Sequence, residues 1–239
     1  MRSGTGAPLG IRTGASPGAA MNGALWPDAS DSAALEEEIR LTVPDPALFS
    51  ALECDLSARV GGGGFLDRSY TDLYLDHPDR LLLKRRLALR LRSTATATHL
   101  EIKGEGVLDG GVWRRPEWRQ GADVVPPAQV RDVADGPVRR RLESLLGREA
   151  PLAPLLTCTI DRRLVALSGR EGARLEVSLD RGEIRAGEGR VGVAELEIEC
   201  GADARAAGLS LARELRERFD LRDAPHSKFR IGLALLGSA

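Results

Sequence analysis

Hydrophobic and charged residues alternate in many short segments of this chain. In the first, Glu36, Glu38 and Arg40 share one face of a predicted strand, while Ile39 and Leu41 lie on the other. Alternating or extended segments of this kind recur at 70–76, 87–92, 100–103, 113–118, 155–160, 162–167, 174–180 and 193–200. Each predicts a strand with an apolar face and a polar or ionised face.

Helical spacing interrupts the strands at three places. Asp45 and Pro46 predict a helix start, because Asp caps the first turn and Pro fits its first position. Apolar residues at helical spacing predict two further helices, at 138–146 and near 203–218. We also predict a hairpin loop at 169–172 and a tight turn at Arg181 and Gly182. Pro116 predicts an edge or a bulge for its strand.

The apolar faces of so many strands can be buried in two ways. One is an open sheet with a solvated side, and the other is a closed barrel with a polar lumen and helices outside. Helices after the first strand, in the middle and near the end favour the barrel, which also leaves no free edges. We therefore predict an α+β fold over residues 34–239: a closed antiparallel eight-stranded β-barrel, or tunnel, with a charged lumen and helices packed outside.

Composition excludes several classes of partner. The net charge is -1, with 34 basic and 35 acidic residues, so no overall field favours nucleic acid. No apolar run is long enough to span a membrane, and no partner of that kind is expected. Residues 1–33 are mainly small and polar and predict a disordered tail, or a start misassigned upstream of Met21.

The cysteine pattern favours a reducing compartment. Cys54, Cys158 and Cys200 are odd in number and far apart, without the spacing of a zinc site. We expect all three to be reduced thiols in the core, and we expect the protein to be cytoplasmic.

The ionised strand faces have a chemistry of their own. Two carboxylates at i and i+2 suit a hard divalent cation, and a guanidinium one step further suits a phosphate oxygen. A solvated outer face is the simpler alternative for any one strand. Because the charged face recurs in strand after strand, a shared charged lumen is favoured. Burying charges in such a lumen costs free energy unless they are paired or neutralised by a ligand. The pattern therefore predicts a polyanion bound together with a divalent metal.

The chain resembles the CYTH family, the triphosphate tunnel metalloenzymes, through motifs that occur in the family's order. These are Glu36-x-Glu38-x-Arg40, Tyr74-x-Asp76-x-Pro78, Arg90-x-Arg92, Glu101-x-Lys103, Arg115-Pro116-Glu117, residues 179–184, Glu195-x-Glu197 and Ser227-Lys228. The resemblance covers residues 34–236 and is greatest to the bacterial inorganic triphosphatases.

This resemblance implies metal-dependent hydrolysis of a triphosphate, foremost inorganic tripolyphosphate to pyrophosphate and phosphate, with Mg²⁺ or Mn²⁺. The metal ligands it implies are Glu36, Glu38, Asp180, Glu195 and Glu197, with Glu176 a weaker candidate. The phosphate ligands are Arg40, Arg90, Arg92, Lys103, Arg115, Arg162 and Lys228. Catalysis would rest on Glu38, Arg90, Arg92 and Lys103. The expected partner is a small triphosphate or polyphosphate, and the protein is expected to be a monomer or a homodimer.

Two departures from the family's pattern leave alternatives open. Asp161 stands close to a position where the family usually has arginine, and Arg162 or Arg163 would substitute through a one-residue shift. Ile231 stands where the family often has arginine. The alternatives are another reaction in the same tunnel, such as thiamine triphosphate hydrolysis or cyclisation of ATP to cyclic AMP, and a non-catalytic sensor of polyphosphate or nucleotide. An aromatic content of 4% argues mildly against a base-stacking pocket.

Overall fold

The computed structural model describes residues 33–60, 64–123, 125–168, 174–201 and 203–237. Apart from residue 33, the predicted tail lies outside the described residues, and so does the predicted hairpin loop at 169–172. The fold described below belongs to the remaining chain.

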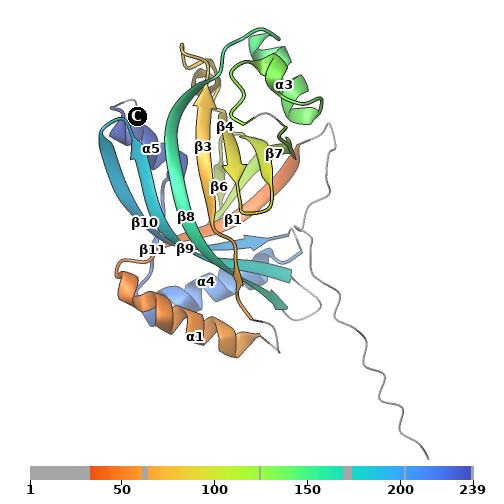
Figure 1. Cartoon of the computed structure of the whole chain (residues 1–239). Helices are drawn as coiled ribbons and strands as arrows, with labels where there is room; N and C mark the ends of the chain where they lie inside the picture. The colour runs from red at the N-terminus through yellow and green to blue at the C-terminus, as the bar shows by residue number, and fades with distance from the viewer. Residues whose placement is uncertain (1–32, 61–63, 124, 169–173, 202, 238–239) are drawn as a thin grey trace, which may run out of the picture.

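Eight antiparallel strands close into a barrel (Figure 1). They are β1 (Ala34–Thr42), β3 (Tyr70–Asp76), β4 (Ala88–Ser93), β5 (Thr98–Lys103), β7 (Val112–Gly121), β8 (Ala153–Ser168), β9 (Arg174–Ala186) and β10 (Gly189–Cys200). The order around the ring is β1-β10-β9-β8-β3-β4-β5-β7, and the pairing of β7 with β1 closes it. The predicted closed eight-stranded antiparallel barrel is therefore confirmed.

Short elements and helices complete the fold. Three short strands, β2 (Leu66–Asp67), β6 (Val107–Asp109) and β11 (Arg222–Asp223), pair with β8, β7 and β1. The helices are α1 (Phe49–Arg59), α2 (Leu81–Lys84), α3 (Pro137–Leu146), α4 (Arg205–Phe219) and α5 (Lys228–Leu235), with 3-10 turns at Pro46–Leu48 and Val130–Asp132. Within the described ranges, no helix has both the length and the apolar character needed to cross a membrane.

The largest apolar core lies outside the barrel, beneath α1 and α4. Asp45 caps the turn before α1 through its side chain, which accepts from the Ala47 backbone 2.9 Å away, as predicted from the sequence. Leu52 and Leu56 of α1 are fully buried against the outer faces of β1, β9 and β10, together with Leu215 of α4. Figure 1 shows the two helices side by side under the strands. The apolar strand faces predicted from alternation therefore point outward here.

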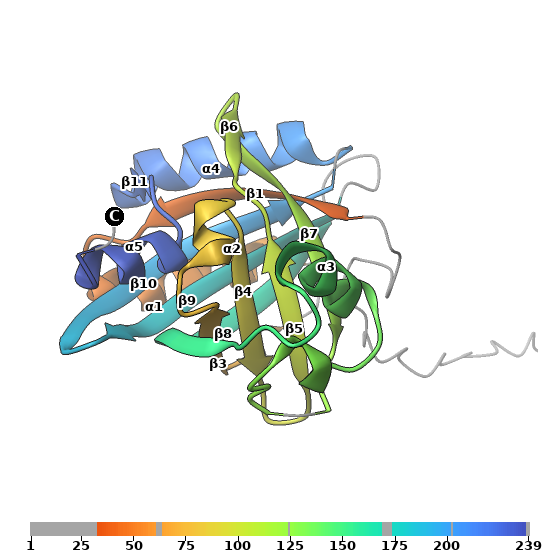
Figure 2. The ribbon, with the colours of Figure 1, turned by 90° about the horizontal axis from the view of Figure 1, so that it is seen from above.

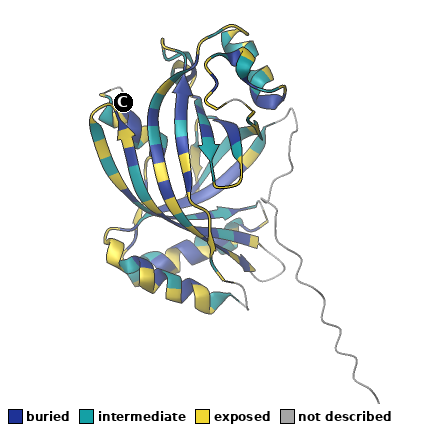
Figure 3. Ribbon diagram, in the orientation of Figure 1, coloured by how far each residue is buried: buried dark blue, intermediate teal, exposed yellow. Residues whose placement is uncertain are grey.

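The inner face of the barrel changes character along the strands. On β9, Asp180 and Ser178 face inward, and so do Ile184 and Ala186 farther along. Helix α5 covers this second, apolar part, and its Gly232 packs so closely that a Cβ there would lie 2.7 Å from a Leu156 methyl. Figure 2 shows α5 lying along β9 and β10, and Figure 3 shows buried positions alternating with more exposed ones along the strands. One end of the lumen is thus filled by apolar packing, and the other part is charged.

Two local predictions are wrong, and a third is right in one of its alternatives. The predicted tight turn at Arg181 and Gly182 does not exist, because β9 runs straight through these residues. Gly182 is required there because a Cβ would lie 2.0 Å from the Thr159 carbonyl oxygen. Of the edge or bulge predicted at Pro116, the edge is absent, since β7 is paired on both sides. The register does shift by one residue there, because residues 104–106 lie opposite only Arg115 and Pro116, as in a bulge. Cys54 is exposed, because the apolar stripe of α1 turns it outward, whereas the other two cysteines are buried.

The segments predicted as separate strands at 155–160 and 162–167 form one continuous strand, β8. Beyond Ile160 its inward positions change from apolar residues to Arg162, which breaks the hydrophobic pattern without ending the strand.

Candidate functional site

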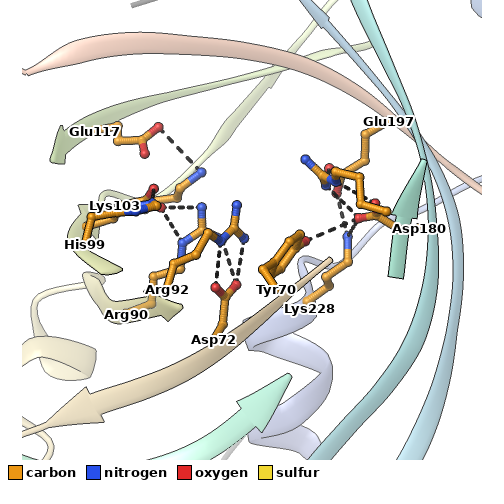
Figure 4. Close-up of polar contacts among 12 residues, drawn as sticks. Tyr70, Asp72, Arg90, Arg92, His99, Lys103, Glu117, Asp180, Glu197 and Lys228 are labelled. Carbon is orange, nitrogen blue, oxygen red and sulfur yellow. Dashed lines mark hydrogen bonds and ion pairs between the residues drawn. The ribbon is translucent and has the colours of Figure 1, made fainter. Parts of the chain in front are cut away.

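The barrel encloses a cavity of about 2600 Å³ lined by the charged inner faces of its strands. All seven predicted phosphate ligands border it: Arg40, Arg90, Arg92, Lys103, Arg115, Arg162 and Lys228. They belong to two groups of paired charges, and Figure 4 shows Arg90, Arg92 and Lys103 of the first group across the lumen from Lys228 of the second. The alternation of the strands explains this, because every second residue of a barrel strand points inward.

The first group begins with the paired glutamates of β1. Glu36 accepts from Lys103 at 2.7 Å and from Arg115 at 2.5 Å, so two cations from β5 and β7 share it. Arg115 also donates to Glu38 at 2.8 Å, and the guanidinium of Arg40 lies 3.4 Å from the same carboxylate. Burial alone would raise the pKa of Glu36, but the charges of Arg115 and Lys103 hold that pKa well below its usual value. Glu36 is therefore ionised, and both carboxylates are bound on several sides.

The same group continues on β3, β4 and β5. Arg92 binds Asp72 through two hydrogen bonds of 2.7 Å, and Arg90 lies 3.2 Å from the same carboxylate. Arg90 also pairs with Glu101, which in turn contacts His99 at 2.8 Å. Burial lowers the pKa of His99, which favours the neutral imidazole. Asp72 is fully buried, so Arg90 and Arg92 keep it from being an unpaired charge.

The second group lies on β8, β9, β10 and the start of α5. Lys228 is 2.6 Å from both Glu195 and Glu197 and 3.0 Å from Asp180. Arg162 binds Asp180 through two hydrogen bonds of 2.6 Å and reaches Glu197 at 2.5 Å. Although burial opposes its charge, the three carboxylates raise the pKa of Lys228 well above its ordinary value. Ser227 caps α5, accepting from the Arg230 backbone at 3.3 Å, and so places Lys228 at the first turn.

Glu117 of β7 differs from Glu36, Glu101 and Glu197, whose pKa values are lowered by neighbouring cations; burial also raises the pKa of Glu195. It lies 3.5 Å from Lys103, which is also bound to Glu36. Burial raises the pKa of Glu117 to about 7, and the nearby carboxylates Glu101 and Glu36 add to this in spite of Lys103. Glu117 is therefore the lumen carboxylate poised to change charge near neutral pH.

The structure separates the candidates that the sequence left open near residue 161. Arg162 is opposite Asp180 in the β8–β9 register and points into the lumen. Asp161 and Arg163 alternate with it and point outward, where Arg163 pairs with Glu53 and Asp67. Ile231 lies on α5 and packs against the apolar cluster at the closed end. The lumen therefore has its arginine at 162, and an apolar residue at 231.

The predicted metal ligands are not equally accessible. Glu36, Glu38 and Glu197 border the cavity, as does the weaker candidate Glu176. Asp180 is fully buried and Glu195 is 5% exposed, and both are held by Lys228.

Among the lumen residues absent from the predicted site are Tyr70, Asp72, Glu101 and Glu117. Asp72 and Glu101 could have been found, because each stands two positions from a predicted motif residue on the same strand face. Glu117 belongs to the recognised Arg115-Pro116-Glu117 motif. Tyr70 had no sequence signal, because a tyrosine at the start of a strand is as consistent with a place in the apolar core as with one in a binding site.

The donor set fits a hard divalent cation in kind, because Glu36, Glu38 and Glu197 offer only carboxylate oxygens. Glu38 shares its oxygen with Arg115 and Arg40, and Glu197 is held by Arg162 and Lys228. Within the described ranges, no three acidic, histidine or cysteine side chains are already gathered around one point as a metal cluster would be. Binding a cation would therefore require these carboxylates to exchange guanidinium or ammonium partners for the metal.

Comparisons with known proteins agree with this geometry. The family model described as "CYTH domain" matches residues 34–230. An inorganic triphosphatase from Haemophilus influenzae is 27% identical over 130 residues, which cover 53% of this chain and 34% of that protein. The match with this chain therefore spans about a third of the length of that relative.

Two solved structures share the fold. A putative adenylyl cyclase from Hippeastrum, reported to have a dominant triphosphatase activity, has a TM-score of 0.63 and 22% identity, covering 83% of this chain and 95% of that one. A putative adenylate cyclase from Bacillus halodurans has a TM-score of 0.55 and 20% identity, covering 81% of this chain and 95% of that one.

Proposed function

This chain belongs to the CYTH domain family, and we propose that it hydrolyses inorganic tripolyphosphate to pyrophosphate and phosphate inside its barrel, with a divalent cation. The similarity to the Haemophilus influenzae inorganic triphosphatase supports this class of reaction. The observation that carries the proposal is the gathering of seven cationic side chains around one enclosed cavity.

The cations form a site for a chain of phosphates. Each lies within 4 Å of at least one carboxylate of the barrel strands, so little reorganisation is needed when a phosphate oxygen takes over an N–H donor. A charge-assisted hydrogen bond of this kind contributes about 1.5–3 kcal/mol. Cations at separate places in the lumen, Arg90 and Arg92 around Asp72 and Arg162 and Lys228 around Asp180, suit a ligand with charge along its length.

The aromatic side chains favour an inorganic ligand over a nucleotide. The guanidinium of Arg92 lies over the ring of Tyr70, and Tyr74 stacks on Phe229. The guanidinium carbon of Arg40 lies over the Trp113 ring, 4.7 Å from the ring centroid. A base would have to compete for ring faces that are in use, whereas tripolyphosphate needs none. The cavity therefore favours the phosphate chain itself as substrate.

Hydrolysis transfers the terminal phosphoryl group to water, breaking one phosphoanhydride bond and releasing orthophosphate and pyrophosphate. A bound Mg²⁺ or Mn²⁺ would polarise phosphoryl oxygens and lower the pKa of a coordinated water. Glu36, Glu38 and Glu197 would hold the cation, with Glu38 central because it borders both Arg40 and Arg115. Asp180 and Glu195 would orient Arg162 and Lys228 toward the phosphates. Arg90, Arg92 and Lys103 would neutralise charge on the transferred group.

A phosphate-release assay tests the proposal. Tripolyphosphate, ATP, thiamine triphosphate and pyrophosphate would each be offered with Mg²⁺, with Mn²⁺ and with a chelator. We expect release from tripolyphosphate in the presence of metal and its loss in Glu38→Gln, which keeps the shape but removes the charge that a cation needs. Melting curves with and without metal and tripolyphosphate would show that the wild-type protein gains stability by mass action and the variant gains much less.

Two outcomes would contradict the proposal. Near wild-type turnover in Glu38→Gln across a range of metal concentrations would remove Glu38 from the metal site. Strong stabilisation by a triphosphate without phosphate release from any of them would make the protein a sensor, and cyclic AMP from ATP would make it a cyclase.

A further inference from the structure

Tyr70 of β3 lies between two guanidinium groups that come from the two strands flanking its own, β4 and β8. The guanidinium carbon of Arg92 is 3.6 Å from the centroid of the tyrosine ring, and that of Arg162 is 5.3 Å away. Tyr70 is 6% exposed, so both contacts are largely shielded from water. Figure 4 shows the ring between the group around Arg90 and Arg92 and the group around Asp180 and Lys228.

The strand order creates this arrangement. Tyr70 starts β3, which pairs with β4 on one side and β8 on the other. Arg92 comes from β4 and Arg162 from β8, so the ring meets one arginine from each flanking strand. The phenol oxygen also lies 3.5 Å from Asp180, the carboxylate that binds Arg162. The ring therefore touches both charge groups of the lumen.

Each arginine is fixed by two kinds of contact. Asp72 binds two N–H groups of Arg92, and Asp180 binds two N–H groups of Arg162. The tyrosine ring supplies the third contact, because the negative face of an aromatic ring attracts the flat face of a guanidinium. Two like charges so close to one ring would otherwise repel each other or turn fully toward their carboxylates. The remaining N–H donors can then point into the cavity.

We infer that Tyr70 is a positioning residue, whose ring sets the separation of the Arg92 and Arg162 guanidiniums and so matches them to a chain of three phosphates rather than to a single phosphate. This inference rests on the proposed function for the identity of the ligand. The ring itself would not touch the reacting atoms.

The chain offers a matched control in Tyr74. It lies on the same strand and the same inner face and is 4% exposed, but it stacks on Phe229, with ring centroids 4.9 Å apart. Tyr74→Leu therefore removes a buried ring of equal size from the apolar end. Tyr70→Leu removes the ring between the arginines, and Tyr70→Phe keeps that ring while removing its hydroxyl.

The first experiment needs no ligand. Unfolding of the metal-free protein would be measured for Tyr70→Leu, Arg92→Met and the double variant, and again with Arg162→Met. Each change is expected to raise the equilibrium constant of unfolding by some factor. If the ring holds both arginines, the product of the two single-variant factors should exceed the factor for the double variant about tenfold in each cycle. Independent effects in both cycles would overturn the inference.

The second experiment measures calorimetric binding of tripolyphosphate and of orthophosphate, together with turnover. In Tyr70→Leu we expect the Kd and KM for tripolyphosphate to rise about tenfold, with a smaller change in kcat, and the Kd for orthophosphate to change much less. Tyr70→Phe should restore the wild-type values, and folded Tyr74→Leu should keep them.

Equal losses of tripolyphosphate affinity in Tyr70→Leu and Tyr74→Leu would show that Tyr70 has a merely structural role. So would equal losses of affinity for tripolyphosphate and orthophosphate in Tyr70→Leu. If the unmodified protein neither bound nor hydrolysed tripolyphosphate, the proposed function would fail, and the binding role of Tyr70 with it. The cycles on the metal-free protein would still decide whether the ring holds the two arginines.

Discussion

Strands β8, β9 and β10 present charged side chains to the barrel interior along one part of their length and apolar side chains along the other. In the charged part, Arg162, Asp180 and Glu197 form close ion pairs. In the apolar part, Leu156 and Ile184 pack against α5. The same three strands thus contribute to two interiors with different physical requirements.

The difference shows how one barrel separates stability from binding. Apolar burial contributes about 25 cal/mol per Å² and requires no partner of matching charge. Buried ion pairs recover little net stability after desolvation, but they hold charges in position for a ligand. We therefore expect changes at the α5 end to affect unfolding and changes in the charged part to affect the binding of triphosphate.

The largest effect on stability is expected from Leu156→Ala. Leu156 is 3% exposed and lies against Gly232 of α5, where backbone packing leaves little room for collapse. The free energy of unfolding should fall by about 2–5 kcal/mol, measured by urea denaturation. Leu66→Ala is the control, since Leu66 is 48% exposed and should cost less than about 0.5 kcal/mol. A weaker affinity for tripolyphosphate in folded Leu156→Ala would show that the two interiors are not separate.

Next in size is the expected effect of Arg90→Ala on binding. Arg90 pairs with Asp72 and Glu101 and borders the cavity. Its loss should remove about 1.5–3 kcal/mol of binding free energy, tenfold or more in Kd or in kcat/KM for tripolyphosphate. Calorimetry and phosphate release would measure this, with Arg131→Ala as control because Arg131 pairs with Glu149 on the surface. Unfolding combined with unchanged affinity in the surviving folded protein would refute a phosphate-binding role.

Glu117→Gln should change how stability depends on pH. Burial raises the pKa of Glu117 to about 7 in the folded protein, above the value of 4.5 expected for an unperturbed carboxyl. The folded state therefore binds this proton more tightly than the unfolded state. The stabilisation is complete below pH 4.5 and is lost as the pH rises through 7.

Because Gln stays neutral, the variant should lose less stability than the wild type between pH 5 and 8, by on the order of 2 kcal/mol. Chemical denaturation at several pH values would measure this. Glu149→Gln is the control, because Glu149 is a surface residue. Parallel pH profiles for the wild type and Glu117→Gln would show that Glu117 is ionised throughout.

The smallest effect is expected from deleting residues 1–33. Their composition offers little to bury, and both interiors of the barrel are formed by later residues. The melting temperature and the turnover of tripolyphosphate should be unchanged. A fall of several degrees in melting temperature would show that the tail packs on the barrel.

The sequence by itself was sufficient to predict most of the helices and strands. The alternation of charged and apolar residues predicted β1, β3, β4 and β5, and capping by Asp45 predicted the helical turn that follows β1. These signals are local, since the period of a strand and the cap of a helix are encoded in neighbouring residues. Six of the seven candidate cations stand at alternate positions of strands, and the resemblance to the CYTH family added Lys228, which lies at the start of α5.

The extent of the strands could not be read locally. Gly182 has the sequence character of a turn, but it lies within β9. A glycine is needed there because the Thr159 carbonyl of the paired strand approaches too closely for any side chain. Similarly, Pro116 suggested an edge or a bulge, and the paired strands on both sides leave only the bulge. Glycine and proline report a local constraint, and only the packed neighbours show which constraint is present.

Only the tertiary structure decided which charges meet. Sequence reasoning left Arg162 and Arg163 as alternatives, and the β8–β9 register chose Arg162 by placing it opposite Asp180. Pairing of Asp72 with Arg90 and Arg92, and the place of Tyr70 between two arginines, likewise join residues from different strands. A slip of one residue in register would turn each of these side chains to the opposite face of the barrel, and register depends on closing the whole ring rather than on any one segment.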